Sequence, residues 1–183
     1  MNIETRAVEG ELEIRDDLDD DYRHLIGIVV PWNATYKMPD GRTESFDPAA
    51  FDKSVKARGD RIPLFQNHET TLAMPVGMAV SFTNRQDGLL ADFKMARTLR
   101  GDESTSLARD RFVTGLSVGF RPIRNRSERR GDTDHVVRLE AALDHVGFVS
   151  NPAYAGAQVL AVRFDPDDEA QAPRLARWRH LRA

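Results

Sequence analysis

The chain of 183 residues contains no cysteine. A disulfide framework and thiol catalysis are therefore both excluded, and a reducing, intracellular setting is compatible with the composition. No apolar run is long enough to cross a bilayer, and the first residues lack the charged and then apolar layout of a secretory signal. We therefore expect neither a membrane span nor a targeting segment.

The sequence also has no excess of positive charge and no metal-binding motif. The net charge of −3 argues against nucleic acid as the main partner. Neither an H-E-x-x-H zinc motif nor a phosphate-binding P-loop is present, and the five histidines are scattered along the chain. No metal or other cofactor is expected.

What is present indicates one globular domain. The hydrophobic fraction is 40% and the charged fraction 30%, which is enough for a core under a charged surface. Many short apolar or alternating segments, with few helices and no strand–helix–strand alternation, predict an α+β fold. We expect a mostly antiparallel sheet, as a closed or partly open β-barrel, with two or three helices outside it. Strands are predicted over 25–30, 61–65, 74–82, 88–95, 117–120, 135–143 and 159–164, and a helix over 103–112 with Asp102 as its N-cap.

A first helix is signalled after residue 46. Asp47 is predicted as its N-cap, with Pro48 in the first helical position. Phe46 is placed to pack on Phe51 across that cap, and Gly59 stands where a left-handed residue would end the helix.

Two segments are charged. Residues 121–134 are predicted to be an exposed hairpin loop, with a basic docking patch as the alternative. An acidic linker then leads to a basic end, so residues 1–164 are assigned to the folded domain and 165–183 to a charged tail. That tail is either a docking helix or a frayed terminus.

The segment TGLSVGF (114–120) places Ser117 between Gly115 and Gly119. Glycines beside a nucleophilic hydroxyl allow another backbone to come close. The segment resembles the G-x-S-x-G elbow of hydrolases only loosely, and a serine among glycines is usually a tight turn or a packed strand. Ser117 alone is therefore weak support for catalysis.

Two histidines have unusual settings. His68 lies just after the end of the predicted strand RIPLF, and His145 lies in an apolar, strand-like segment beside Asp144. A serine hydroxyl needs a base to take its proton during attack, and that base needs a group that fixes its orientation. We hypothesise that Ser117, His68 and His145 form one site. From residue types alone, a structural protein with incidental serine and histidines is favoured over this hypothesis.

Six segments in order resemble the prohead maturation proteases of tailed bacteriophages, which are similar in fold to the herpesvirus assemblins. The likeness covers roughly residues 22–162. The segments are G-x-x-x-P-W (27–32), GRTESFDPAAFDKS (41–54), LFQNHE (64–69), DGLLADFKM (87–95), TGLSVGF (114–120) and L-x-H-V-x-F-V-x-N-P-A-Y (143–154).

The resemblance implies a serine endopeptidase with Ser117 as nucleophile and His68 as general base. Many relatives carry an acid where this chain has His145, which instead resembles the Ser-His-His arrangement of the assemblins. Asp144 or Glu140 is the rival third member. In an unbroken strand both acids would face away from His145, and a bulge would reverse that expectation.

The resemblance also implies the partners. The expected substrate is the scaffolding segment of the major capsid protein, cut inside the assembling prohead in the host cytoplasm. Self-cleavage after Phe164, a homodimer and contact with the portal are further expectations. The remaining alternative is a non-catalytic structural or scaffolding β-barrel protein of the capsid.

Overall fold

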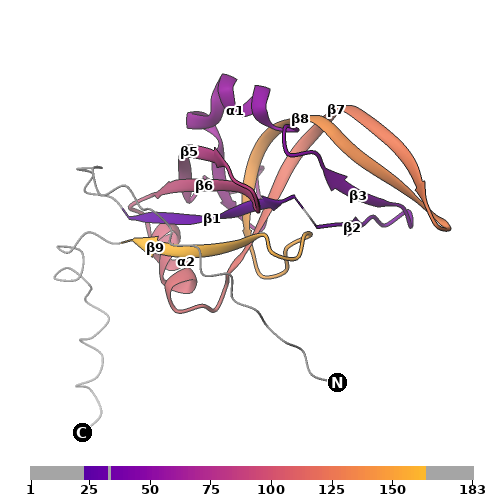
Figure 1. The fold of residues 1–183 in the computed structure, drawn as a ribbon. Coiled ribbons are helices and arrows are strands. Elements are labelled where there is room, and N and C mark those ends of the chain that lie inside the picture. The colour runs from indigo at the N-terminus through magenta and orange to yellow at the C-terminus, as the bar shows by residue number, and fades with distance from the viewer. Residues whose placement is uncertain (1–22, 33, 164–183) are drawn as a thin grey trace, which may run out of the picture.

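The computed structural model describes residues 23–32 and 34–163 (Figure 1). The tail at 165–183 lies outside the described residues. The strands are β1 (His24–Pro31), β2 (Tyr36–Lys37), β3 (Thr43–Phe46), β4 (Pro63–Gln66), β5 (Gly77–Asn84), β6 (Gly88–Met95), β7 (Gly115–Arg130), β8 (Thr133–Val149) and β9 (Gln158–Arg163). The helices are α1 (Asp52–Arg58) and α2 (Leu99–Arg109), and a short 3-10 helix spans Gly59–Arg61. Among these residues, neither helix has the length and apolar content to span a membrane.

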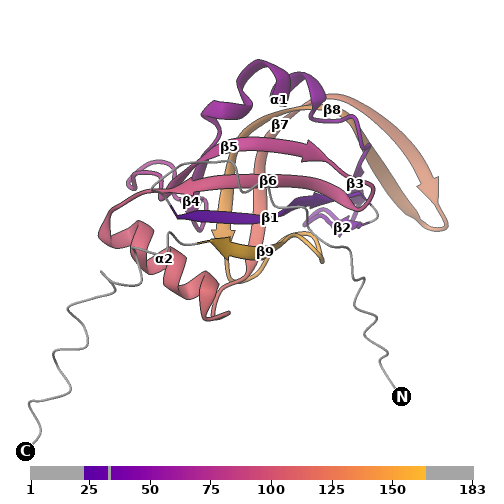
Figure 2. The same ribbon diagram turned by 60° about the vertical axis from the view of Figure 1, so that its left-hand side comes forward.

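The strands form one sheet in the order β2-β3-β8-β4-β5-β6-β1-β9-β7, and β7 also pairs with β8. The pairings are antiparallel except for β3–β8 and β4–β8, which are parallel. Figures 1 and 2 show α1 and α2 with strands between them. The sheet is mixed, with mostly antiparallel pairings as predicted, and the described residues hold two α-helices, within the two or three expected. The closed or partly open β-barrel stays a prediction.

The centre of the fold is β1, which pairs with β6 on one side and β9 on the other. Its apolar, β-branched residues are buried over the whole of His24–Val30, as the sequence predicted for a strand closed by Pro31. A strand with neighbours on both edges and contacts on both faces favours such a continuous apolar run. This core fixes the sheet on which β7 and β8 carry the candidate site.

The first helix begins later than predicted. Asp47 caps a turn, accepting a hydrogen bond from the Ala49 amide at 2.9 Å, and α1 begins at Asp52 after Phe51. Phe46 and Phe51 do pack, with ring centroids 4.9 Å apart. Gly59 has φ −57°, so it continues into the 3-10 helix and is not the predicted left-handed end. Burial of Phe51 sets the start of the helix more strongly than the local capping signals do.

The second helix also differs from its predicted bounds. It starts at Leu99, with the Thr98 hydroxyl accepting from the Gly101 amide at 3.2 Å, so Asp102 is not the N-cap. Its buried face consists of small residues at helical spacing: Gly101, Ser104, Thr105 and Ala108. A side chain at Gly101 would collide with the carbonyl of Ala96. The small face therefore allows α2 to lie close to the neighbouring backbone.

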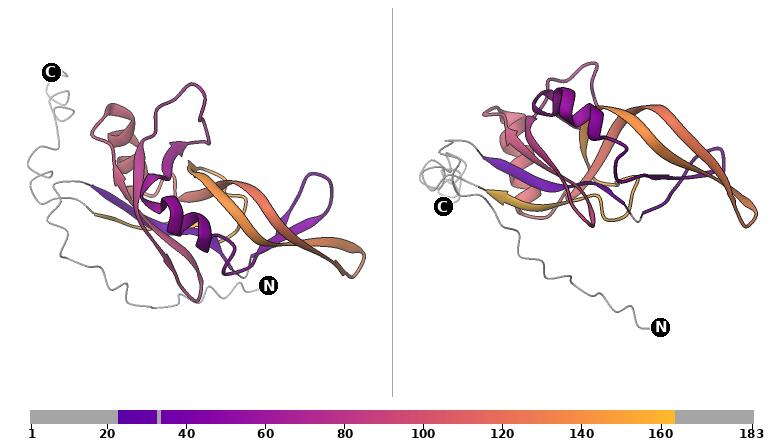
Figure 3. Two further views of the ribbon diagram at one scale, coloured as in Figure 1. Left: turned by 90° about the horizontal axis from the view of Figure 1, so that it is seen from above. Right: turned by 45° about the horizontal axis from the view of Figure 1, so that its top comes forward.

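The charged segment forms strands and not the predicted loop. Residues 121–130 of β7 pair with 133–142 of β8 around a turn at Gly131 and Asp132, and we call this paired segment the arm. Figures 1 and 3 show the arm extending to one side of the molecule with β2 and β3 beside it, and β3 pairs with residues 135–138 of β8. Its β7 residues are exposed, with Glu128 half-buried, so the predicted exposure is correct.

Candidate active site

His68 lies in a tight turn directly after β4. The Glu69 amide donates to the Gln66 carbonyl at 2.9 Å and closes the turn. Both central residues have positive φ, 50° for Asn67 and 58° for His68. Such a pair is typical of a type I′ turn, in which asparagine suits the first position and glycine the second. A left-handed histidine costs roughly 1–2 kcal/mol, so surrounding contacts must hold it.

Contacts on both sides of the turn supply this support. The Asn67 amide donates to the Phe148 carbonyl at 3.0 Å and anchors the turn to β8. On the far side, the Glu69 carboxylate accepts from the amides of Thr71 and Leu72, both at 3.0 Å. These two hydrogen bonds lower the pKa of Glu69, because they stabilise the ionised carboxylate.

The imidazole rings of His68 and His145 lie directly on strand backbone. A Cβ atom at Gly147 would stand 2.7 Å from Cε1 and 2.8 Å from Nε2 of His68. A Cβ atom at Gly119 would overlap the His145 ring. Glycine is required at both positions, since any side chain would occupy the space that a ring fills.

The two histidines are hydrogen-bonded to each other. His68 Nδ1 lies 2.8 Å from His145 Nε2, and the ring planes are inclined at 75°. Phe65 packs edge-on against the His145 ring, with centroids 5.9 Å apart. Both histidines are half-buried, so the pair is held by packing as well as by its hydrogen bond.

Ser117 lies opposite Gly147 in the β7–β8 pairing, and Gly119 lies opposite His145. Paired residues of antiparallel strands share a face of the sheet, as do alternate residues of one strand. Ser117, Gly119, His145 and Gly147 therefore share one face. Cβ positions across such a pair are about 5 Å apart. The His68 ring lies on Gly147, the residue opposite Ser117, so the fold brings the three predicted residues to one face of the sheet.

Burial is the main cause that lowers the pKa of both histidines. For His68, the charge that His145 would carry lowers the pKa further, whereas Asp144 partly opposes the effect of burial on His145. Both rings are thus biased towards the neutral form at pH 7. A neutral pair has one ring nitrogen donating and the other accepting in the 2.8 Å contact.

The rival acids bind other partners. The register shifts between Gly119 and Phe120, so β8 has a bulge at Asp144, and the alternation expected of an unbroken strand fails there. The carboxylate of Asp144 nevertheless accepts from Arg121, with its shortest contact at 3.0 Å. Arg121 also lowers the pKa of Asp144. Glu140 binds Lys53 at 2.9 Å.

Two features of the site were not predicted: the role of Gly147 and the left-handed turn at Asn67 and His68. Gly147 carried a signal, because a glycine inside a strand marks close approach of another group. The only sequence signal for the turn was Asn67, because asparagine tolerates positive φ.

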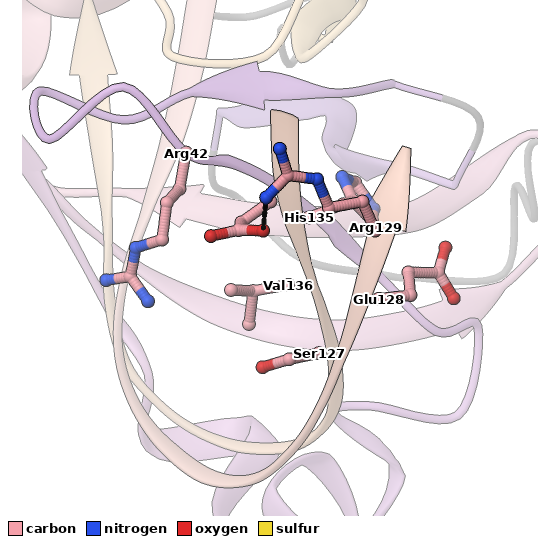
Figure 4. Close-up of a pocket in the computed structure, with 7 residues that line it drawn as sticks. Arg42, Ser127, Glu128, Arg129, His135 and Val136 are labelled. Carbon is pink, nitrogen blue, oxygen red and sulfur yellow. Dashed lines mark hydrogen bonds and ion pairs between the residues drawn. The ribbon is translucent and has the colours of Figure 1, made fainter. Parts of the chain in front are cut away.

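A pocket of about 300 Å³ lies in the arm and not at the histidine pair (Figure 4). Arg42 reaches it from the segment before β3, and the other lining residues belong to the arm. Its two arginines are paired with acids, Arg42 with Asp40 at 2.7 Å and Arg129 with Asp134 at 3.3 Å. The lining residues are Arg42, Ser127, Glu128, Arg129, Asp134, His135 and Val136.

Among solved structures, the chain is similar to the protease of Kaposi's sarcoma-associated herpesvirus. For its complex with a hexapeptide phosphonate inhibitor, the TM-score is 0.51 at 13% identity, covering 79% of this chain and 66% of that one. The chain thus spans about two thirds of that structure's length. For the complex of the same protease with a dimer disruptor, the TM-score is 0.46 at 14% identity, covering 81% and 79% of the two chains. The first likeness confirms the predicted assemblin-like fold.

No curated protein matches the chain in sequence. The sequence profile of the caudovirus prohead serine proteases, however, matches residues 10–171. The predicted recognition and enzyme class are therefore confirmed, and this chain belongs to the caudovirus prohead serine protease family.

Proposed function

We propose that the protein is a serine endopeptidase in which Ser117 is the nucleophile, His68 the general base and His145 the group that orients His68. The observation that supports this assignment is the 2.8 Å hydrogen bond between His68 Nδ1 and His145 Nε2, made by a His68 ring that lies on the residue opposite Ser117.

The proton positions follow from that hydrogen bond. Nδ1 of His68 faces His145, which leaves Nε2 as the nitrogen that takes the Ser117 proton. For Nε2 to accept, the proton of neutral His68 must be on Nδ1 and be donated to Nε2 of His145. His145 then carries its own proton on Nδ1. As Ser117 attacks a peptide carbonyl, His68 becomes an imidazolium and later returns the proton to the leaving amine.

A neutral imidazole stabilises that imidazolium less than a carboxylate would, because it offers a hydrogen bond without a negative charge. Slow turnover is therefore expected. It is sufficient for an enzyme that cuts each partner once within a closed shell.

The proposed substrate is the scaffolding segment of the major capsid protein, removed inside the assembling prohead. Family membership supports this choice, as it does self-cleavage after Phe164. We also propose that the protein forms a homodimer and contacts the portal. The pairing of β7, at one end of the strand order, with β8, the third strand from the other end, joins the strands from β8 to β7 into a ring and supports a barrel.

The test is co-expression with the major capsid protein of the same virus, followed by intact mass measurement. Wild-type protein should shorten the capsid protein, and Ser117→Ala should abolish the mass loss. Ser127→Ala is the matched control, because Ser127 lies on the same strand but in the exposed arm. Unchanged masses with the wild type, together with no fluorophosphonate label on Ser117, would favour the structural or scaffolding role.

A further inference from the structure

We propose that Gln66 and Ser104 are positioning residues that hold the His68 turn in its working geometry, an inference that rests on the proposed function. Gln66 is the last residue of β4 and the first of the turn, so its position determines where the turn places His68. Its side-chain amide donates from Nε2 to the Ser104 hydroxyl at 3.0 Å. That hydrogen bond connects α2 to the turn.

Ser104 is a fixed acceptor. Its side chain is fully buried, so water does not replace it as a partner. Its hydroxyl donates to the Arg100 carbonyl at 2.7 Å, and a hydroxyl has one proton, so a lone pair is left for Gln66. The three groups form one directed chain from Gln66 through Ser104 to the helix backbone. This chain restricts both the position and the orientation of the Gln66 amide.

The turn needs such support because its own conformation is unfavourable. Asn67 and His68 are both left-handed, and the Asn67 amide is tied to β8 through Phe148. With Gln66 tied to α2 as well, the residues before His68 are held from two elements. Loss of the α2 link lets the turn relax, and the ring of His68 then moves relative to His145 and Ser117. A misplacement of about 1 Å costs up to about a hundredfold in rate.

The test uses the rate of reaction with a fluorophosphonate, which needs no knowledge of the natural substrate. Ser104→Ala removes only the hydroxyl and inserts a better helix former. Gln66→Met keeps the length of the side chain and removes its amide. Each variant should lower the inactivation rate constant about tenfold or more and leave the inhibitor's binding constant within twofold, because the base is misplaced and not the binding surface. The double variant should lose no more than either single variant.

Thr105→Val is the matched control. Thr105 is also fully buried and also donates to a carbonyl of its own helix, that of Gly101 at 2.7 Å, but the Gln66 amide donates to its neighbour Ser104. It should keep the wild-type rate. A wild-type rate in Ser104→Ala, or an equal loss in Thr105→Val, would overturn the positioning role.

Failure of the proposed function gives a different result. In that case the wild-type protein itself does not react with the fluorophosphonate, and the ring ¹⁵N chemical shifts of His68 become the deciding measurement. Shifts that change in Ser104→Ala but not in Thr105→Val support the positioning of His68 by α2. Unchanged shifts in both variants overturn it.

Discussion

At the scale of single residues, the site depends on glycines as much as on its reactive side chains. Gly119 and Gly147 lie on β7 and β8, each beneath one imidazole ring. Their missing side chains bring the rings down to the sheet, where Ser117 is on the same face. The hydrogen bond between His68 and His145 therefore depends on positions that have no functional group of their own.

Replacing Gly147 with alanine tests this dependence. The added methyl group would stand 2.7–2.9 Å from three atoms of the His68 ring, closer than carbon atoms approach without displacement. The ring must move away from Ser117, so we expect capsid cleavage and fluorophosphonate labelling to fall about a hundredfold. The far-ultraviolet circular dichroism should be unchanged, since the collision is with a movable ring.

Gly59→Ala is the control for that substitution. Its added methyl group would meet Val55 and Phe82 at 3.4 and 3.5 Å, which are ordinary contacts, and the backbone φ is −57°. Labelling should stay at the wild-type rate. Equal labelling by Gly147→Ala and wild type would show that the ring position on Gly147 is not required.

At the scale of elements, a buried ion pair holds the arm to the body. Glu44 on β3 accepts from Arg138 on β8, with the shorter of two contacts at 2.6 Å, and from the Tyr154 hydroxyl at 2.6 Å. Glu44 is 5% exposed and Tyr154 is 3% exposed. Burial and the neighbouring Glu44 raise the pKa of Tyr154, so it remains a donor. The arrangement connects β3, β8 and the segment before β9.

Tyr154→Phe removes one donor from this buried carboxylate and keeps the ring. Because a hydrogen bond to a buried charge contributes roughly 1.5–3 kcal/mol, we expect the free energy of unfolding to fall by about 2 kcal/mol in urea titrations. Tyr36→Phe is the control: the Tyr36 ring lies 5.7 Å from that of Tyr154 but is not hydrogen-bonded to Glu44. Equal losses in the two variants would contradict a specific role for the Tyr154 hydroxyl.

The elements also show which features the sequence could predict. The apolar run of β1 predicted that strand almost residue for residue, because the run records burial on both faces. The strand β6 was predicted with its observed bounds from the apolar segment that follows the turn-forming residues. The helix starts were misplaced, since packing of Phe51 and the small face of α2 outweighed the local capping residues. Ser117, His68 and His145 were chosen by chemistry and resemblance, and their catalytic roles stay a prediction. The turn that holds His68 was not predicted, because its anchors, Phe148 and Ser104, are distant in sequence.

At the scale of the whole molecule, buried histidines link stability to pH. Burial is the main cause that lowers the pKa of His68, His135 and His145. His135 is fully buried, with its ring nitrogens 2.8 and 2.9 Å from the hydroxyls of Thr43 and Ser45. The protonation of these three histidines therefore links both the candidate site and the part of the arm near its turn to the same range of pH.

The sign of the effect follows from these shifts. In the unfolded chain a histidine has a pKa of about 6.5, so below that pH the unfolded state binds more protons than the folded state. The histidines therefore make their full contribution to the free energy of unfolding above about pH 6.5. That contribution decreases as the pH falls towards the lower pKa values of the folded state. The carboxyls with lowered pKa, such as Glu69 and Asp144, act in the same direction but only near pH 4 and below.

We expect the urea midpoint to be lower at pH 5.5 than at pH 7.5. The corresponding decrease in the free energy of unfolding is on the order of 1 kcal/mol. The double variant His68→Gln/His145→Gln should show a smaller difference between the two pH values, because His135 remains as a contributor. A midpoint that stays constant or rises towards pH 5.5 in the wild-type protein would mean that these histidines accept protons as readily folded as unfolded. In that case His68 would also be partly protonated near neutral pH, where the proposed mechanism needs it as a free base.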